Sequence, residues 1–234
     1  MTARPRAVAG DPLEAVNVKA FEATQAVDRA AVGPIALGYR HIVPEPARDG
    51  LRNALRNLRE PVVAINFLLQ LKPGKAAETL ARLGINSTIG VAGLVDVARR
   101  KPFHLPYRPN GFADTFGYYG VKPGAYLFLP LVGPTTVRDL VGGGLDRLVL
   151  PLAIGRPFNR VTYTIPTGVI GALQHRINID DELRELREKA PDPYAALRDA
   201  YLRRRQAEID ALHGHIPARS IETGGAAEKD DARP

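Results

Sequence analysis

The side chains that could carry acid–base or metal chemistry are few and scattered along the chain. No two histidines flank a glutamate at the i,i+4 spacing by which a metallopeptidase holds zinc. A short pair near the end of the chain, His213 and His215, is too weak a pattern to predict a metal site. The histidines are His41, His104, His175, His213 and His215.

Covalent catalysis has still less support. The chain has no cysteine, which excludes a disulfide framework, a thiolate metal site and a cysteine nucleophile. The two serines, Ser87 and Ser220, both lie outside any Gly-x-Ser-x-Gly nucleophile elbow. The residue chemistry therefore predicts a protein that is not an enzyme.

Two runs resemble ligand-binding motifs, Gly142-Gly143-Gly144 and Asp180-Asp181-Glu182. A phosphate-binding glycine loop needs a strand before it and a Lys-Ser/Thr pair after it, and both are missing here. Close helix packing or a flexible kink is the favoured interpretation of the glycines. The acids open an expected helix, where negative charge interacts favourably with the positive end of the helix dipole.

The chain is basic, with 32 Lys and Arg against 25 Asp and Glu and a net charge of +7 over 234 residues. Such a charge fits nucleic acid, an anionic membrane surface or an acidic protein, as well as a merely solvated surface. Arg203-Arg204-Arg205 is the densest cluster, but tryptophan is absent and no basic strand is interleaved with aromatic residues. We therefore expect an exposed helix face there and no nucleic-acid partner.

The elements that would position these residues are helices. Asp11 as N-cap, Pro12 and Glu14 predict a helix that Gly33-Pro34 ends. An apolar stripe at steps of three and four predicts helix over 51–69, which Pro61 breaks or kinks into two. Further helices are expected over 75–85, 89–97, 136–148 and 162–176, with an irregular loop over 99–112 and an apolar, Pro/Gly-rich segment over 117–134.

The end of the chain is richer in charge. Residues 180–211 predict a helix that is mostly solvated, followed by a disordered tail over 213–234. The longest stretches without a charged side chain, Pro123–Val137 and Val161–His175, contain Pro and Gly and fall short of the roughly 20 apolar residues of a spanning helix. Strand-like alternation is scarce, so the fold is predicted to be all-α.

A series of short motifs in fixed order, over about residues 11 to 212, is similar to the MlaA/VacJ family of Gram-negative outer-membrane lipoproteins. The motifs include Asp11-Pro12-Leu13-Glu14, Gly38-Tyr39-Arg40, Val43-Pro44-Glu45-Pro46-Ala47-Arg48-Asp49-Gly50, Asn57-Leu58-Arg59-Glu60-Pro61, Ile85-Asn86-Ser87-Thr88-Ile89-Gly90, Gly93-Leu94-Val95-Asp96-Val97-Ala98, Leu129-Pro130-Leu131 and Asp192-Pro193-Tyr194.

The resemblance implies a ring-shaped single domain over 11–212, built of amphipathic, partly in-plane membrane helices around a central amphipathic channel. Disordered segments over 1–10 and 213–234 would flank it. It implies a place at the periplasmic face of the outer membrane, where misplaced outer-leaflet glycerophospholipids are removed and passed to a periplasmic carrier. Trimeric porins are the implied partners, and no cofactor is implied. The alternative is an adaptor that bridges porins without conducting lipid.

The resemblance also suggests site residues. The candidates for lipid contact or the channel wall are Asn17, Phe21, Asn66, Asn86, Asp96, Arg138 and Asp139, although capping or pairing is the favoured role for most. The candidates for membrane contact are Phe67, Leu68, Leu69, Tyr126, Leu127 and Phe128, for which ordinary helix packing is the alternative. The family's signal peptide and lipid-bearing cysteine are not in this sequence, so the anchoring mode stays open.

Overall fold

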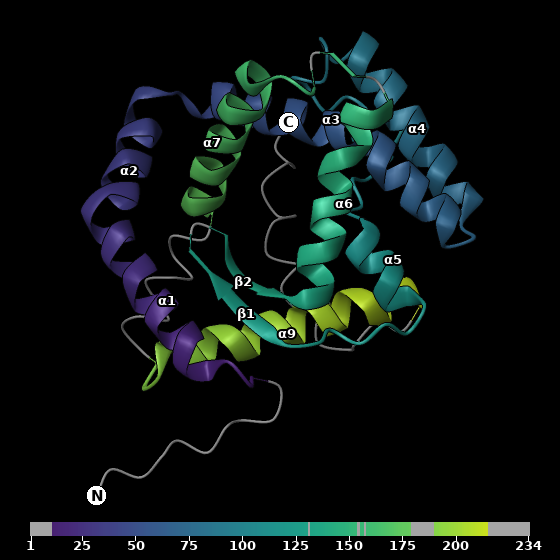
Figure 1. The fold of residues 1–234 in the computed structure, drawn as a ribbon. Helices are drawn as coiled ribbons and strands as arrows, with labels where there is room; N and C mark the ends of the chain where they lie inside the picture. Colours follow the sequence, from purple (N-terminus) through teal and green to yellow (C-terminus); the bar gives the residue numbers. More distant parts are fainter. Residues whose placement is uncertain (1–10, 131, 154, 157, 179–189, 215–234) are drawn as a thin grey trace, which may run out of the picture.

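The computed structural model describes residues 11–130, 132–153, 155–156, 158–178 and 190–214. The expected disordered segment 1–10, most of the expected tail (215–234) and the acidic run 180–182 lie outside these ranges. Within them the protein is mostly helical, with one small hairpin (Figure 1). The all-α prediction is confirmed.

The first helix continues past the point where the sequence predicts its end. Helix α1 (Glu14–Val27) passes into a π-helical turn, η1 (Asp28–Val32), and then into α2 (Gly33–Ile42). Pro34 lies in the first turn of α2, directly after a π turn in which the N–H of Gly33 donates to the carbonyl oxygen of Asp28 five residues earlier. Leu13 takes the N-cap position, so the assignment of Asp11 as N-cap is also wrong.

The next two helices form a closely packed pair. Helix α3 (Glu45–Leu69) runs without interruption through Pro61, which corrects the expected division into two helices. Residues on both sides of Pro61 are buried, so tertiary packing holds the segment in one helix. Helix α4 (Pro73–Thr88) packs along α3 and includes the predicted helix 75–85.

Residues 89–97 form turns, which corrects the helix predicted there. Val91, Ala92 and Gly93 have left-handed φ values of 53°, 55° and 87°. A Cβ on Gly93 would lie 2.7 Å from Cβ of Asn57, so the chain crosses α3 at a point where only glycine fits. The expected loop follows and leads into the short helix α5 (Phe112–Tyr118).

The Pro/Gly-rich segment contains a hairpin that sequence alternation does not reveal. Strand β1 (Tyr126–Leu129) pairs antiparallel with β2 (Gly133–Thr136), and Tyr126 lies opposite Thr136. Helix α6 (Val137–Ala153) follows directly, then α7 (Val161–Asn178) and α9 (Pro193–Leu212). Helix α9 buries Tyr194, Arg198, Tyr201 and Ile209, which corrects the expectation of a mostly solvated helix.

The elements close into a ring (Figure 1). Beginning at α1, the circuit runs through η1 and α2 to α7, then to α3, α5, α6, β2 and β1, and β1 contacts α1 again. Helix α4 packs on the outside of α3, and α9 lies under the hairpin against α5 and β2. Each neighbour along the circuit is in contact with the next, as the ring-shaped expectation requires.

Buried polar side chains hold the junctions of this ring. Arg176 of α7 forms an ion pair with Asp28 of η1 at 2.6 Å. Gln174 of α7 donates a 2.7 Å hydrogen bond to the carbonyl oxygen of Arg48 in α3. At the opposite side, Asn17 of α1 donates to the carbonyl oxygen of Tyr126 in β1 at 3.0 Å. Hydrogen bonds need a defined geometry, so these pairs fix which elements are neighbours.

The apolar core is correspondingly small. One cluster gathers Tyr126 and Phe128 of the hairpin with Tyr194 and Tyr201 of α9, and Phe21 of α1 packs on it. The other joins Val63 and Phe67 of α3 with Ala76 of α4. Many other large apolar side chains remain on the surface.

Candidate functional site

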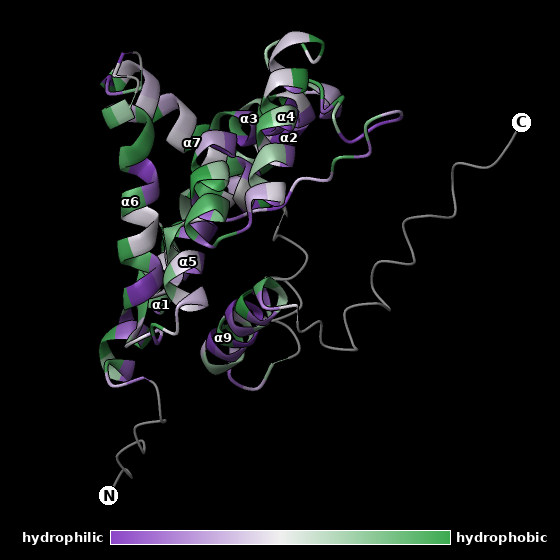
Figure 2. Ribbon diagram, turned by 90° about the vertical axis from the view of Figure 1, so that its right-hand side faces the viewer, coloured by the Kyte–Doolittle hydropathy of each residue, from purple (hydrophilic) through white to green (hydrophobic). Residues whose placement is uncertain are grey.

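Helix α6 has two contrasting faces. Asp139, Gly143 and Asp146 recur at steps of four and three and line a cavity. At about 100° per residue, Val141 and Leu148 lie on the opposite side. That side is exposed and apolar and also includes Val137, Leu145 and Leu152. In the view of Figure 2, α6 runs along one edge of the molecule and carries both hydrophobic and hydrophilic residues. The helix thus separates a cavity lined by its two carboxylates from an apolar outer surface.

Exposed apolar side chains continue on other elements of the ring. Helix α2 exposes Ile35, Leu37 and Ile42, and α7 exposes Val161, Ile165 and Val169 at steps of four. Apolar surface in this amount is uncommon on a freely soluble monomer and indicates a contact with another apolar phase or protein. None of the described helices combines the length and the hydrophobicity that crossing a membrane requires.

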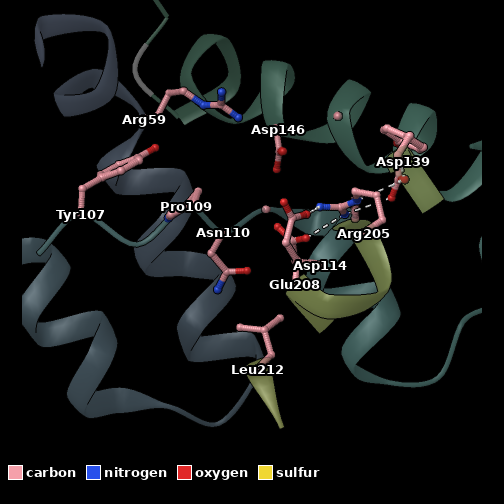
Figure 3. A pocket seen from close by; sticks show the side chains of 14 residues that line it. Arg59, Tyr107, Pro109, Asn110, Asp114, Asp139, Asp146, Arg205, Glu208 and Leu212 are labelled. Carbon is pink, nitrogen blue, oxygen red and sulfur yellow. Dashed lines mark hydrogen bonds and ion pairs between the residues drawn. The ribbon is translucent and has the colours of Figure 1, made fainter. Parts of the chain in front are cut away.

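The cavity has a volume of about 320 Å³. Its walls come from α3, the loop before α5, α5 itself, α6 and α9 (Figure 3). Most of the side chains that point into it are charged or polar, including four carboxylates and two guanidinium groups. No three histidine or carboxylate side chains among the described residues are grouped so that they could hold a metal ion.

Arg205 lies at the centre of one wall. Its Nη2 is 2.8 Å from Oδ1 of Asp114 and 3.1 Å from Oδ1 of Asp139, and its Nη1 pairs with Glu208. Tyr201 donates a 2.6 Å hydrogen bond to Asp139. Burial alone would raise the pKa of Asp139, but the hydrogen bond from Tyr201 and the charge of Arg205 outweigh it and lower the pKa. Asp139 is therefore ionised and already paired.

Asp146 is in a different position. Its Oδ1 accepts a 3.0 Å hydrogen bond from the backbone N–H of Phe112. Its Oδ2 lies 2.4 Å from where a Cβ on Gly111 would be, so glycine there leaves room for the carboxylate. Burial raises the pKa of Asp146, and Asp114 adds to this, while the Phe112 N–H and Arg59 oppose it. In Figure 3 the Asp146 side chain points from α6 into the cavity.

The structure gives most of the suggested channel residues a structural role. Asn17 joins α1 to β1: its Nδ2 donates to Asp11 at 2.8 Å, and its Oδ1 accepts from the Phe128 N–H at 2.9 Å. Phe21 packs edge-to-face on Phe128 with 5.4 Å between ring centroids. Asn66 accepts a 2.6 Å hydrogen bond from Thr115.

Asn86 and Asp96 belong to a second polar cluster between α3 and α4. Asn86 donates to Asp96 at 3.0 Å. Arg82, which is buried, pairs with Glu60 at 2.8 Å and with Asp96 at 3.2 Å. This cluster fixes the turns over 89–97 against the α3–α4 pair and lies outside the cavity.

Arg138 and Asp139 are adjacent in sequence but differ in position. Arg138 is buried, pairs with Asp139 at 3.2 Å and donates to the Val121 carbonyl oxygen. Of the suggested channel residues, Asp139 alone lines the cavity.

The suggested membrane-contact residues divide into two groups. Leu68 and Leu69 are exposed, and Leu127 is half-buried. Phe67, Tyr126 and Phe128 are buried in the two apolar clusters, so protein atoms already cover the faces that were expected to meet lipid.

Sequence reasoning did not identify Asp146, Asp114 and Arg205 as neighbours, because they come from three different helices. The spacing of Asp139, Gly143 and Asp146 on one helix face was the available signal. Arg205 also corrects the interpretation of Arg203-Arg204-Arg205 as a simple exposed face: Arg203 and Arg204 are exposed, whereas Arg205 is held by its carboxylates.

The chain matches a family and several relatives. Residues 9–208 match the family model described as MlaA lipoprotein. The chain is 33% identical over 198 residues to the intermembrane phospholipid transport system lipoprotein MlaA of Shigella flexneri, covering 83% of this chain and 76% of the relative. It is 33% identical over 187 residues to the protein of the same name from Haemophilus influenzae, covering 79% and 72%.

A solved structure is also similar. It is described as the structural basis for maintenance of bacterial outer membrane lipid asymmetry, and it aligns with a TM-score of 0.75 at 31% identity. The alignment covers 85% of this chain and 98% of that one.

Proposed function

Because the chain belongs to the MlaA lipoprotein family, we propose that it removes misplaced glycerophospholipids from the outer leaflet of the outer membrane and delivers them to a periplasmic carrier. The chain is a component of an intermembrane phospholipid transport system that maintains outer-membrane lipid asymmetry. The proposal places it at the periplasmic face, with residues 11–212 as the transport domain and porin trimers as partners.

The observation that carries the proposal is the pair of faces on α6. A phospholipid has a charged headgroup and two acyl chains, and it needs different surroundings for each. The cavity beside Asp139 and Asp146 is polar, while Val141 and Leu148 on the other side are exposed and apolar. A lipid that passes around or beside α6 can keep its headgroup among polar groups and its chains against apolar ones.

The energetic reason for such an arrangement is the size of the hydrophobic penalty. Each methylene exposed to water costs about 0.8 kcal/mol, so two acyl chains cannot leave a membrane through water at a useful rate. A ring of helices with an apolar exposed surface can lie in the interface without a spanning segment. The exposed residues of α2, α6 and α7 supply that surface.

The proposal is tested by isolating the protein from membranes in mild detergent and identifying bound lipid by mass spectrometry. We expect glycerophospholipid to co-purify in stoichiometric amount and the protein to partition into vesicles. A lipid-free protein that does not partition would contradict the proposal. A porin adaptor that conducts no lipid would instead bind porin trimers while carrying none, so porin pull-down in parallel separates the two functions.

A further inference from the structure

We propose that the cavity beside α6 is a headgroup site for a zwitterionic lipid carrying a primary ammonium group, a phosphoethanolamine lipid, and that it disfavours anionic headgroups. This inference rests on the proposed function and names the lipid class that the same site takes. It follows from the charges of the cavity, from the position of Asp146 and from the position of Arg59.

Of the carboxylates that line the cavity, only that of Asp146 forms no ion pair among the described residues, because Arg138, Arg204 and Arg205 pair with the other three. Four carboxylates line the cavity, against the two guanidinium groups of Arg59 and Arg205, whereas the whole chain carries +7. Those carboxylates belong to Asp114, Asp139, Asp146 and Glu208. A carboxylate without an ion-pair partner attracts an ammonium group and repels an anionic headgroup. The basic outer surface would by itself favour anionic lipid, so the cavity and the surface predict opposite selectivities.

Arg205 and Asp146 differ in what they leave for a ligand. The guanidinium of Arg205 is engaged by three carboxylates, so it has little capacity to bind a phosphate. The Asp146 carboxylate receives a backbone N–H on Oδ1, and neighbouring carboxylate charge from Asp114 increases the cost of its ionisation. An ammonium group beside it would donate hydrogen bonds, offset the burial that raises its pKa, and make a charge-assisted contact.

Arg59 supplies the opposite end of the site. It projects from α3, is exposed, and lines the cavity together with Tyr107 (Figure 3). It is near enough to Asp146 to lower the pKa of that carboxyl by its charge. A guanidinium group is suited to two phosphate oxygens. Phosphate at Arg59 and ammonium at Asp146 therefore reproduce the charge sequence of a zwitterionic headgroup.

The surroundings favour a lipid over a soluble zwitterion of the same chemistry. The cavity volume of about 320 Å³ is at the small end of the usual range for ligand sites, which suits a headgroup and not a whole lipid. Leu212, Pro109 and Ala113 add apolar wall, and the exposed stripe of α6 is one helix diameter away. The acyl chains would thus find apolar surface close to the bound headgroup.

The test uses the full chain in nonionic detergent micelles that contain equimolar dioleoyl phosphatidylethanolamine and dioleoyl phosphatidylglycerol. Lipid that stays with the protein through size exclusion is quantified by mass spectrometry. We expect the bound ethanolamine lipid to exceed the glycerol lipid by about tenfold, the factor that one charge-assisted contact provides. Replacing the lipids with soluble glycerophosphoethanolamine and glycerophosphoglycerol should leave nothing bound after size exclusion.

Single substitutions test which residue binds the ammonium group and which binds the phosphate. Asp146→Asn should bring the lipid ratio to one or below, because the amide carries no charge for the ammonium. Arg59→Gln should lower total bound lipid several-fold with the ratio unchanged, because both lipids carry the phosphate. Glu22→Gln, on an exposed face of α1, is the matched control and should change neither. If Asp146→Asn does not fold, Glu208→Gln should lower the ratio in the same direction.

Four results would overturn the inference. A wild-type ratio equal to that of the micelle, or in favour of the glycerol lipid, would remove the selectivity while leaving lipid transport intact. If the folded variants Asp146→Asn and Glu208→Gln both keep the wild-type ratio of bound lipids, the selectivity does not come from this cavity. Retention of the soluble headgroup would identify a soluble zwitterion as the ligand. Absence of any bound lipid would remove the proposed function and this inference together.

Discussion

Helices α3 and α6 are both amphipathic and both contain an internal proline, yet α3 buries many more of its residues than α6 does. Helix α3 buries Asn57, Glu60 and Asn66 along with its apolar stripe, whereas α6 buries only Arg138 and Gly142. The apolar residues of α6 are exposed on one side, and its acids face the cavity on the other.

The difference indicates which part of the ring is a structural scaffold and which part is the working surface, meaning the surface that contacts lipid. The α3–α4 pair is held by ion pairs and hydrogen bonds with specific geometry. Helix α6 is held at Gly142 and Asp146 by α5 and at Asp139 by α9, whereas its apolar side is exposed. Four predictions test this division, beginning with the largest effect on stability.

Removing the guanidinium from the scaffold should be the most damaging change. Arg82→Met leaves Glu60 and Asp96 without their partner, and Glu60 is fully buried. Breaking a buried ion pair in this way costs about 3–5 kcal/mol. Thermal and denaturant unfolding in detergent measure the loss. Arg108→Met, which removes an exposed pair with Glu78, is the control and should cost about 0–1 kcal/mol.

The free energy of unfolding that Arg82→Met loses relative to the wild type should depend on pH. Burial raises the pKa of Glu60 above its ordinary value, and Arg82 opposes that rise. A carboxyl with a raised pKa binds its proton more readily in the folded state, so stability increases as the pH falls through that raised pKa toward the ordinary value. The deficit of Arg82→Met should therefore shrink between about pH 7 and about pH 5. A deficit that grows on acidification would show that Glu60 is not the group left unpaired.

The three consecutive glycines of α6 should respond differently to alanine. A Cβ at Gly142 would lie 2.2 Å from the backbone nitrogen of Ala113, so Gly142→Ala should push α5 and α6 apart and cost about 1–3 kcal/mol. A Cβ at Gly144 would meet open space, so Gly144→Ala should increase the free energy of unfolding by about 0.5–1 kcal/mol, because alanine has the higher helix propensity. Circular dichroism melts compare the two. Equal effects would mean that α5 and α6 do not meet at Gly142.

These glycines also show what sequence patterns can and cannot predict. Close helix packing or a flexible kink was the favoured interpretation of the run; close packing applies at Gly142, although the pattern could not tell which of the three glycines makes the contact. Local periodicity likewise predicted α4, α6 and α7 to within a few residues. Outcomes set by contacts distant in sequence were missed: the continuous α3 through Pro61, the π turn before Pro34, and the left-handed turn at Gly93 against Asn57.

The residues that line the cavity could likewise be predicted only in part. Asp139 was identified from the sequence, but Asp146, Asp114 and Arg205 belong to three helices whose approach depends on ring closure. Ring closure in turn depends on pairs such as Arg176 with Asp28, which are far apart in the chain and carry no local pattern. The hairpin was missed because four residues per strand are too few for alternation to stand out.

A charge on the outer face of α6 should affect the membrane more than the fold. Leu148 and Leu80 have similar exposure, 51% and 50%, on α6 and α4 respectively. Either leucine changed to lysine should alter the free energy of unfolding in detergent by no more than about 0.5 kcal/mol. Leu148→Lys should lower partition into vesicles about tenfold, since a leucine buried in lipid contributes about 1.5–3 kcal/mol. An equal loss in Leu80→Lys would contradict the division between scaffold and working surface.

The central claim, that the headgroup of a transported lipid enters the cavity beside α6, is tested most directly by blocking that cavity. Gly143 lines the cavity and Gly144 does not, and a Cβ added at either position would meet open space. The measurement is the rate at which a pyrene-labelled phospholipid leaves donor vesicles that carry the protein for acceptor vesicles. Gly143→Trp should reduce this rate at least about tenfold with unfolding and partition unchanged, while Gly144→Trp should transfer lipid at the wild-type rate. Equal rates in the two variants would contradict the claim.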